Sequence, residues 1–300
     1  MMFGNWELTL LLTKFATYAA VSSCVGSVLM QTLRSNQLRT TDTKLEAFDV
    51  WLSRWFLKWA SFGLVISLLQ LPFQAGAMAE NGLTGMFAPL MLSIMWQSAV
   101  GSQVSFIIVG FTLLLLSEWG INKLARFKSI LRLATVTGFI LLATSFTFTG
   151  HTVALNTVFK GLLVLHILAM AAWAGSLWPL HQSCKALPAD SLVILMAYFG
   201  KVAVFFVSIL IACGVLLLLQ LVEPISNLFT TNYGQLLMLK LIFVSGMLLL
   251  AAWHKLKLVA ELAQHKNAQP LRLSIFIETL LVVSVLVTTS VFTTLVGPQS

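Results

Sequence analysis

Charged side chains are scarce in this sequence. Only 9% of its 300 residues are Asp, Glu, Lys or Arg, whereas soluble domains carry about 25%. Hydrophobic residues make up 58% of the chain, which is more apolar surface than a water-soluble core of this size needs. The composition therefore excludes a soluble globular domain and predicts a membrane protein.

Cysteine is also rare, and several catalytic motifs are missing. Cys24, Cys184 and Cys213 lie in different segments without CxxC spacing, which excludes a zinc site or a disulfide framework and predicts buried structural thiols. The sequence has no phosphate-binding loop, no phosphorylatable aspartate motif and no CPC in an apolar run. It lacks the signatures of an ATP-driven metal pump, and we expect that the protein is not an enzyme.

Long apolar runs are what the sequence has instead. Eight of them are long enough to cross about 30 Å of hydrocarbon as helices, at residues 6–30, 55–74, 96–116, 130–149, 158–180, 199–221, 233–253 and 273–295. The predicted fold class is all-α, a polytopic membrane helix bundle of about eight transmembrane helices in one membrane domain, 1–300. The sequence L-L-Q-L ends both the second and the sixth run, and suggests a weak repeat of four spans over 1–125 and 126–300.

The basic residues predict the orientation of the bundle. Of the 18 Lys and Arg, all but Lys14, Lys160 and Lys240 fall in alternate loops or in the span ends beside them. By the positive-inside rule these loops are cytoplasmic, and both termini are periplasmic. The net charge of +8 then reflects topology and contact with anionic lipids, and no nucleic acid is expected as a partner because the basic loops are short.

The fifth apolar run contains a histidine that a lipid-facing helix would not carry. His166 is followed by Met170 and Trp173 at i+4 and i+7, so the three share one helix face. Such a residue usually faces a cavity, and a His–Met pair suits copper better than magnesium or calcium. The pattern predicts a metal path through His151, His166 and Met170, with Met238 as a further candidate ligand at a comparable outer depth. A structural hydrogen bond for His166 and core packing for the methionines are the alternatives.

Two lysines complicate a cation path. Lys14 and Lys240 both lie about 6 Å outside the midplane of their runs, and burying each costs roughly 3 kcal/mol. A positive charge beside the path repels a cation unless the lysine is neutral or paired. Glu7 is a candidate partner for Lys14. Lys240 either extends toward Tyr233 at the helix end or binds an anion, such as a cofactor carboxylate or an acidic lipid.

Membrane histidines also bind haem in electron-transfer proteins of the cytochrome b type. Such a haem needs two axial ligands from facing helices at matched depth. His151 is a possible second ligand beside His166, whereas His181 and His254 lie at span ends and are expected to be interfacial. A haem protein and a non-transporting copper-handling or assembly subunit are therefore alternative functions.

Several short motifs, taken in order, resemble the copper resistance protein D family. They are G-H-T at 150–152, L-H-I-L-A-M-A-A-W-A-G-S-L-W-P-L at 165–180, T-x-Y-G-x-x-L-x-x-K at 231–240, a glutamate early in the last run (Glu278) and a terminal Gly-Pro. The resemblance is strongest over 130–298. One departure is Gly175-Ser176 where the family usually has Gly-Gly. Serine is also small, so we expect close helix packing to be kept.

The resemblance implies a function, a location and a partner. The implied function is copper transport from the periplasm, with uptake as the expected direction, and a contribution to copper resistance and homeostasis. The implied location is the bacterial inner membrane, and the implied partner is a periplasmic copper carrier of the copper resistance protein C type. Trp173, Tyr233, Lys240 and Glu278, together with Lys14, are the further polar residues expected to be functional.

Overall fold

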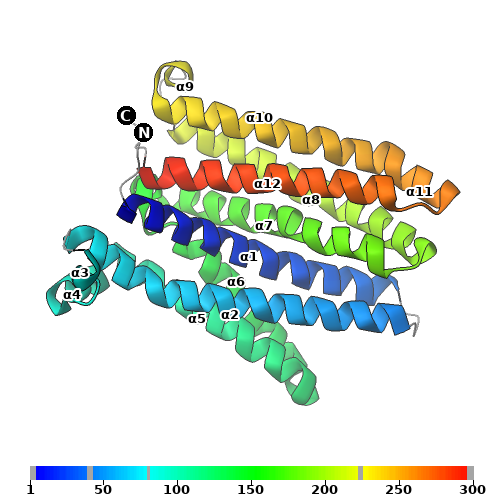
Figure 1. The fold of residues 1–300 in the computed structure, drawn as a ribbon, viewed down its shortest axis with the longest axis horizontal. Coiled ribbons are helices and arrows are strands. Elements are labelled where there is room, and N and C mark those ends of the chain that lie inside the picture. Colours follow the sequence, from blue (N-terminus) through cyan, green and yellow to red (C-terminus); the bar gives the residue numbers. More distant parts are fainter. Residues whose placement is uncertain (1–4, 39–42, 80–81, 222–225, 296–300) are drawn as a thin grey trace.

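The structure is a computed structural model that describes residues 5–38, 43–79, 82–221 and 226–295. Within these ranges it is almost entirely helical and has no β-strand. Eight helices are long and apolar enough to cross a membrane, and they run side by side in one bundle (Figure 1). The predicted fold class, an all-α membrane helix bundle, is confirmed.

The long helices form the bundle, and the short ones connect them. The long helices are α1 (Asn5–Gln37), α2 (Thr43–Ala79), α5 (Ala99–Lys123), α6 (Lys128–Ser145), α7 (Thr157–Ala186), α8 (Ala189–Leu221), α10 (Asn232–Trp253) and α12 (Gln269–Leu295). The short ones are α3 (Gly82–Gly85), α4 (Pro89–Gln97), η1 (Ala125–Phe127), η2 (Gly150–Ala154), α9 (Asn227–Thr230), the π-helical turn η3 (His254–Leu258) and α11 (Val259–His265).

Several helices extend beyond the predicted spans at the basic end of the bundle. α2 begins at Thr43, where the apolar run begins at 55, and α8 begins at Ala189, where the run begins at 199. Hydropathy detects only the part of a helix that matches the hydrocarbon, whereas charged turns continue past it. Two ion pairs join neighbouring helix ends here, Arg34 with Asp49 and Lys266 with Asp190.

The third predicted span begins too early. Trp96 belongs to α4 and not to the span, because Ser98 interrupts the helix with an extended backbone. The Ser98 hydroxyl then accepts a hydrogen bond from the Val100 amide at 3.1 Å and caps α5. Ser98 thus begins a helix inside an apolar run. An average of hydropathy over a window does not detect such a single polar residue.

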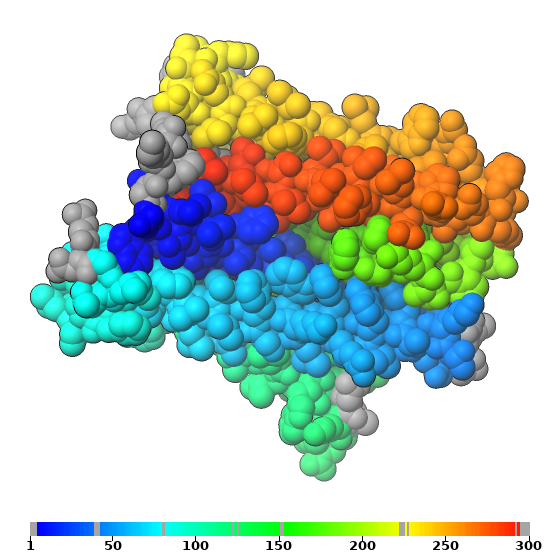
Figure 2. All heavy atoms as spheres, in the orientation of Figure 1, coloured from blue at the N-terminus to red at the C-terminus, as the bar shows by residue number. Residues whose placement is uncertain are grey.

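α1 lies at the centre of the bundle. It packs against α2, α7 and α12, while α7 packs also against α8, and α10 packs chiefly against α12. The pair α5–α6 lies at the edge against α2 (Figure 1). Figure 2 shows α1 and α12 next to each other on one face, with part of the green α7–α8 region exposed between α2 and α12 at the basic end.

The contact between α1 and α7 depends on two glycines. A Cβ atom added at Gly175 would lie 1.8 Å from the backbone oxygen of Ser22, and one added at Gly26 would lie 2.0 Å from the Gly175 carbonyl carbon. Ser176 is fully buried between them and donates its hydroxyl to the Ala172 carbonyl at 2.7 Å. The close packing predicted for Gly175-Ser176 is confirmed.

α1 begins and α12 ends at the same end of the bundle (Figure 1). The opposite end carries the basic loops. Assignment of the α1 start to the periplasm stays a prediction from the charge pattern. The weak repeat of four spans also stays a prediction.

Candidate functional site

His166 lines a cavity of about 310 Å³ inside the bundle, here called the His166 cavity. Side chains from α1, α7, α8, α10 and α12 form its wall, and most of them are apolar. The lining includes Lys14, His166, Met170, Gly214, Tyr233 and Lys240. The bundle therefore contains a polar site at the level of the predicted histidine.

The ring of His166 has a fixed orientation. Its Nδ1 lies 3.2 Å from the backbone oxygen of Leu210 on α8. A carbonyl oxygen only accepts, so Nδ1 carries the proton, and in the neutral ring Nε2 keeps its lone pair. A Cβ added at Gly214 would lie 3.3 Å from His166 Cε1, so the glycine gives the ring its room. Hydrogen bonds of this kind orient metal-binding histidines in other proteins.

Met170 lines the same cavity, one helical turn further along α7. Its sulfur accepts a hydrogen bond from the Ser22 hydroxyl of α1 at 3.7 Å. That contact holds the thioether beside the site and still leaves the sulfur a second lone pair. The cavity thus offers one nitrogen and one sulfur donor from adjacent turns of one helix.

Three other predicted residues are placed elsewhere. Trp173 is 2% exposed and lines a second cavity, because seven residues along α7 move it about 10.5 Å further along the helix axis. Met238 lines neither cavity, although Leu237 and Lys240 beside it on α10 do line the His166 cavity. The side chain of His151 lies outside the described residues. Of the four predicted metal ligands, the structure places His166 and Met170 in one cavity, and the role of His151 stays a prediction.

Both lysines point into the His166 cavity. Lys14 Nζ donates a hydrogen bond to the Thr293 carbonyl of α12 at 3.0 Å. Lys240 lines the same cavity as His166 and Tyr233. Among the described lining residues there is no Asp or Glu. The cavity therefore holds two basic side chains together with His166 and Met170.

The T-x-Y-G motif begins α10. The Thr231 side chain accepts a hydrogen bond from the Gly234 amide at 3.0 Å and caps the helix. Tyr233 is 3% exposed and lines the cavity, and Lys240 follows it two turns later on the same face. The motif therefore fixes where α10 starts and, through helical spacing, where Lys240 enters the cavity.

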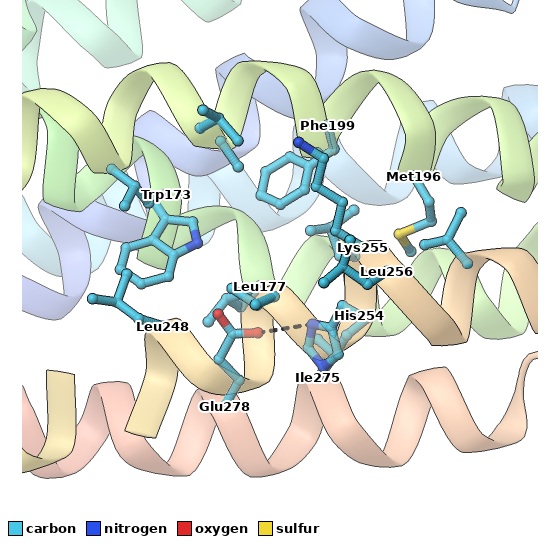
Figure 3. A pocket seen from close by; sticks show the side chains of 18 of the residues that line it. Trp173, Leu177, Met196, Phe199, Leu248, His254, Lys255, Leu256, Ile275 and Glu278 are labelled. Atoms are coloured by element: carbon cyan, nitrogen blue, oxygen red, sulfur yellow. Dashed lines mark ion pairs between the residues drawn. The ribbon is translucent and has the colours of Figure 1, made fainter. Parts of the chain in front are cut away.

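The second cavity measures about 360 Å³ and is here called the Glu278 cavity. Glu278 on α12 is 1% exposed, and its Oε2 lies 3.1 Å from His254 Nδ1 (Figure 3). His254 Nε2 lies 2.6 Å from the Ser274 hydroxyl. His254 was expected only to be interfacial, and the structure adds that its side chain is 13% exposed and paired with a buried carboxylate.

A sequence signal for this pair exists and was missed. His254 precedes Lys266 by 12 residues and Glu278 follows it by 12. Lys266 has a positive φ of 56° and ends α11, so the chain reverses there. Two residues equally far from a tight helix–helix turn lie at the same depth in an antiparallel pair. The spacing therefore indicates the contact.

The described residues contain no group of three or more His, Cys, Asp and Glu arranged to hold a metal ion. The cysteines are free thiols, with Cys24 and Cys213 buried and Cys184 half-buried. A resident site with many hard or thiolate ligands is therefore not formed by this part of the chain. His166 and Met170 supply one nitrogen and one sulfur atom to the same cavity.

The fold and the two cavities define a multi-span membrane protein with polar sites inside its bundle. Residues 193–292 match the model of the family described as copper resistance protein D. The chain is also 28% identical over 251 residues to "Copper transport protein CutJ" of Bacillus subtilis (strain 168), which covers 80% of this chain and 44% of that relative. No solved structure matches the chain significantly.

These matches confirm the resemblance to the copper resistance protein D family that the sequence motifs indicated. The chain spans less than half the length of the curated relative.

Proposed function

We propose that this protein binds copper at His166 and Met170 and moves it through the helix bundle as cargo. The observation that carries the proposal is the hydrogen bond from His166 Nδ1 to the Leu210 carbonyl. It leaves Nε2 as a donor atom in a cavity that the Met170 thioether also lines. Imidazole nitrogen and thioether sulfur together suit Cu(I). The description of the matching family and the name of the relative support copper as the cargo.

We propose uptake from the periplasm across a bacterial inner membrane, with a contribution to copper resistance and homeostasis. The charge pattern supports an orientation in which the His166 cavity is nearer the periplasm. A periplasmic copper carrier of the copper resistance protein C type is the proposed donor. Since the sequence has no ATP-hydrolysis motif, transport is driven by the carrier or by an existing gradient, and the protein acts as a transporter and not as an enzyme.

Substitution of His166 tests the site. We expect His166→Ala to abolish copper-dependent accumulation and to weaken copper binding by the purified protein at least about tenfold, at unchanged membrane abundance. His166→Gln keeps a donor for the Leu210 carbonyl but is a poor copper ligand, so it should fail as well. Met170→Leu keeps the side-chain volume and should give a smaller loss.

The control for this experiment is His265→Ala, which removes an exposed histidine of α11. It should leave accumulation unchanged. The readout is intracellular copper content at fixed external copper. Full function in His166→Gln would make the histidine structural and would move the copper path elsewhere.

The alternative functions predict different observations. His181 stacks on Trp178 with ring centroids 5.1 Å apart and lies 3.4 Å from Arg272 Nε, so it faces other groups than the His166 cavity. Among the described residues His166 is the one histidine that lines this cavity, whereas a cytochrome b-type haem takes two. A haem absorbance band in the purified protein would favour that reading. Copper binding without any change in cellular copper would favour a non-transporting subunit.

A further inference from the structure

We propose that Glu278, His254 and Ser274 form a proton-binding site within the bundle, and that the site exchanges its proton for the cation that crosses. Proton binding is inferred from the Glu278 cavity alone. Only the exchange of the proton for a cation rests on the proposed copper transport. The site is separate from His166 and Met170.

The Glu278 carboxylate is buried inside the bundle and not exposed at its surface. It lies in α12, is 1% exposed, and its Oε1 atom is buried with no hydrogen-bond partner among the described residues. The carboxylate lines the cavity of about 360 Å³ (Figure 3). Burying a carboxylate inside a membrane is costly, and such residues often mark an ion or proton path. The orphan oxygen gives an incoming proton a place to bind.

The hydrogen bonds around His254 tolerate both protonation states. The neutral ring donates Nδ1–H to Glu278 Oε2 and accepts the Ser274 hydroxyl proton at Nε2. After the ring gains a proton, Nε2–H donates to the same hydroxyl oxygen, because a hydroxyl both donates and accepts. Because no hydrogen bond is lost when the ring gains the proton, no buried polar group is left without a partner, which would cost free energy. A purely structural pair has no need of a reversible third partner.

The charge balance of the pair favours exchange. Neutral His254 with ionised Glu278 carries one negative charge, and binding one proton makes the pair neutral, with the proton on Nε2 or on the carboxyl group. Burial disfavours an uncompensated charge. When the proton leaves, a monovalent cation nearby restores the balance. One proton released for each cation that passes conserves charge.

The other charged groups around the pair are few. Lys255 of η3 lines the cavity and is exposed. On α7, His181 lies beside Arg272 of α12, and on α1 Lys14 contacts the far end of α12 at Thr293. Lys240 of α10 lines the other cavity. Glu278 is therefore the one described carboxylate that lines either cavity.

A proton suits this site better than copper. Both ring nitrogens of His254 are engaged in hydrogen bonds, and a carboxylate is a hard ligand that Cu(I) does not prefer. Met196 does line the Glu278 cavity, so copper binding there is tested directly below.

The two cavities are close enough to communicate. Leu248 of α10 lines both of them, and Trp173, two turns along α7 from His166, lines the Glu278 cavity. His254 begins the π-helical turn η3, directly after α10. Such turns occur often at functional sites. A shift of α10 at Leu248 therefore reaches the His254–Glu278 pair through one continuous element.

The first experiment measures protonation directly and without copper. We expect pH-difference infrared spectra of the purified protein to show the carbonyl stretch of a buried carboxylic acid, absent in Glu278→Gln and kept in Glu261→Gln, the matched control on α11. Ser274→Ala should keep this band but shift its midpoint pH, because it removes the reversible partner of His254. The Ser274→Ala variant therefore tests the site even if Glu278→Gln does not fold. A band that persists in Glu278→Gln, or an unmoved midpoint in Ser274→Ala, would overturn the site.

The second experiment measures exchange in proteoliposomes that contain an internal pH dye. Copper flux should change the internal pH in wild type and in Glu261→Gln, and should not do so in Glu278→Gln. Copper flux without a pH change in wild type would overturn the exchange. A titrating band without any copper flux would leave the proton site standing and contradict the proposed function instead. If purified Glu278→Gln bound one copper ion fewer per protein molecule than wild type, the His254–Glu278 pair would be a copper site and the proton assignment would be rejected.

Discussion

Single residues give the His166 cavity its unusual chemistry. Two lysines and a histidine face a largely apolar space, and no described carboxylate lines it. A positive charge weakens the binding of a second cation at short range. Under the proposed function, a charged Lys240 would weaken copper binding at His166 and favour release, while Lys14 is held by the Thr293 carbonyl.

This interpretation makes a prediction for Lys240. We expect Lys240→Met to tighten copper binding by a few-fold to about tenfold, on the order of 1 kcal/mol, because a repelling charge near His166 is removed. Lys240→Arg stays charged and should bind no more tightly than wild type. Copper titration of the purified variants measures both.

Lys160→Met is the control for this series. It removes a lysine from the first turn of α7 that does not line the cavity, and it should leave the affinity unchanged. If Lys240→Met bound copper with wild-type affinity, the lysine would have no part in the copper site.

At the scale of elements, the α1–α7 contact holds the site together. Met170 receives its hydrogen bond from Ser22 of α1, and the backbone of the same Ser22 touches Gly175. Close approach of the two helices therefore both stabilises the bundle and places a hydroxyl on the proposed copper ligand. Small residues at such contacts are what allow membrane helices to pack without a hydrophobic driving force.

Gly175→Ala should separate α1 from α7. The added Cβ would overlap backbone atoms of Ser22, which cannot rotate away as a side chain does. We expect a loss of about 1–3 kcal/mol in unfolding free energy and weaker copper binding. Gly161→Ala on the same helix is the control, because no atom lies within 4 Å of its added Cβ. Thermal unfolding in detergent compares the two, and equal stabilities would contradict the close contact.

At the scale of the whole molecule, charge is concentrated at one end. The basic loops, with the Arg34–Asp49 and Lys266–Asp190 pairs, lie opposite the end at which α1 begins. This distribution supports a cytoplasmic basic end next to anionic lipid headgroups. The proposed copper path would then run from the His166 cavity toward the Glu278 cavity.

Thiol labelling tests the orientation. In a variant without the native cysteines, single cysteines at the exposed positions Leu83 and Phe229 should react with an impermeant reagent added to intact spheroplasts. Cysteines at Ser129 and Asn267, at the basic end, should react only after the membrane is opened. Reaction of Asn267→Cys in intact spheroplasts would reverse the orientation and place the His166 cavity away from a periplasmic donor.

The sequence by itself determined the membrane class and the eight helices, and it singled out His166, because hydropathy and an ionisable residue in an apolar run are local features. It also indicated the family resemblance, because the order of the motifs can be read from the sequence alone. Helix ends were less well predicted, because hydropathy does not detect charged helical turns or a capping serine such as Ser98.

Only the tertiary structure decided which polar groups meet. Met170 shares a cavity with His166, whereas Met238 does not, because the rotation of α10 against α12 is set by packing and not by depth. His254 meets Glu278 because α11 and α12 turn back on each other at Lys266. Helical spacing assigns residues to a face, but the contacts between faces depend on how closely neighbouring helices approach and in what rotation.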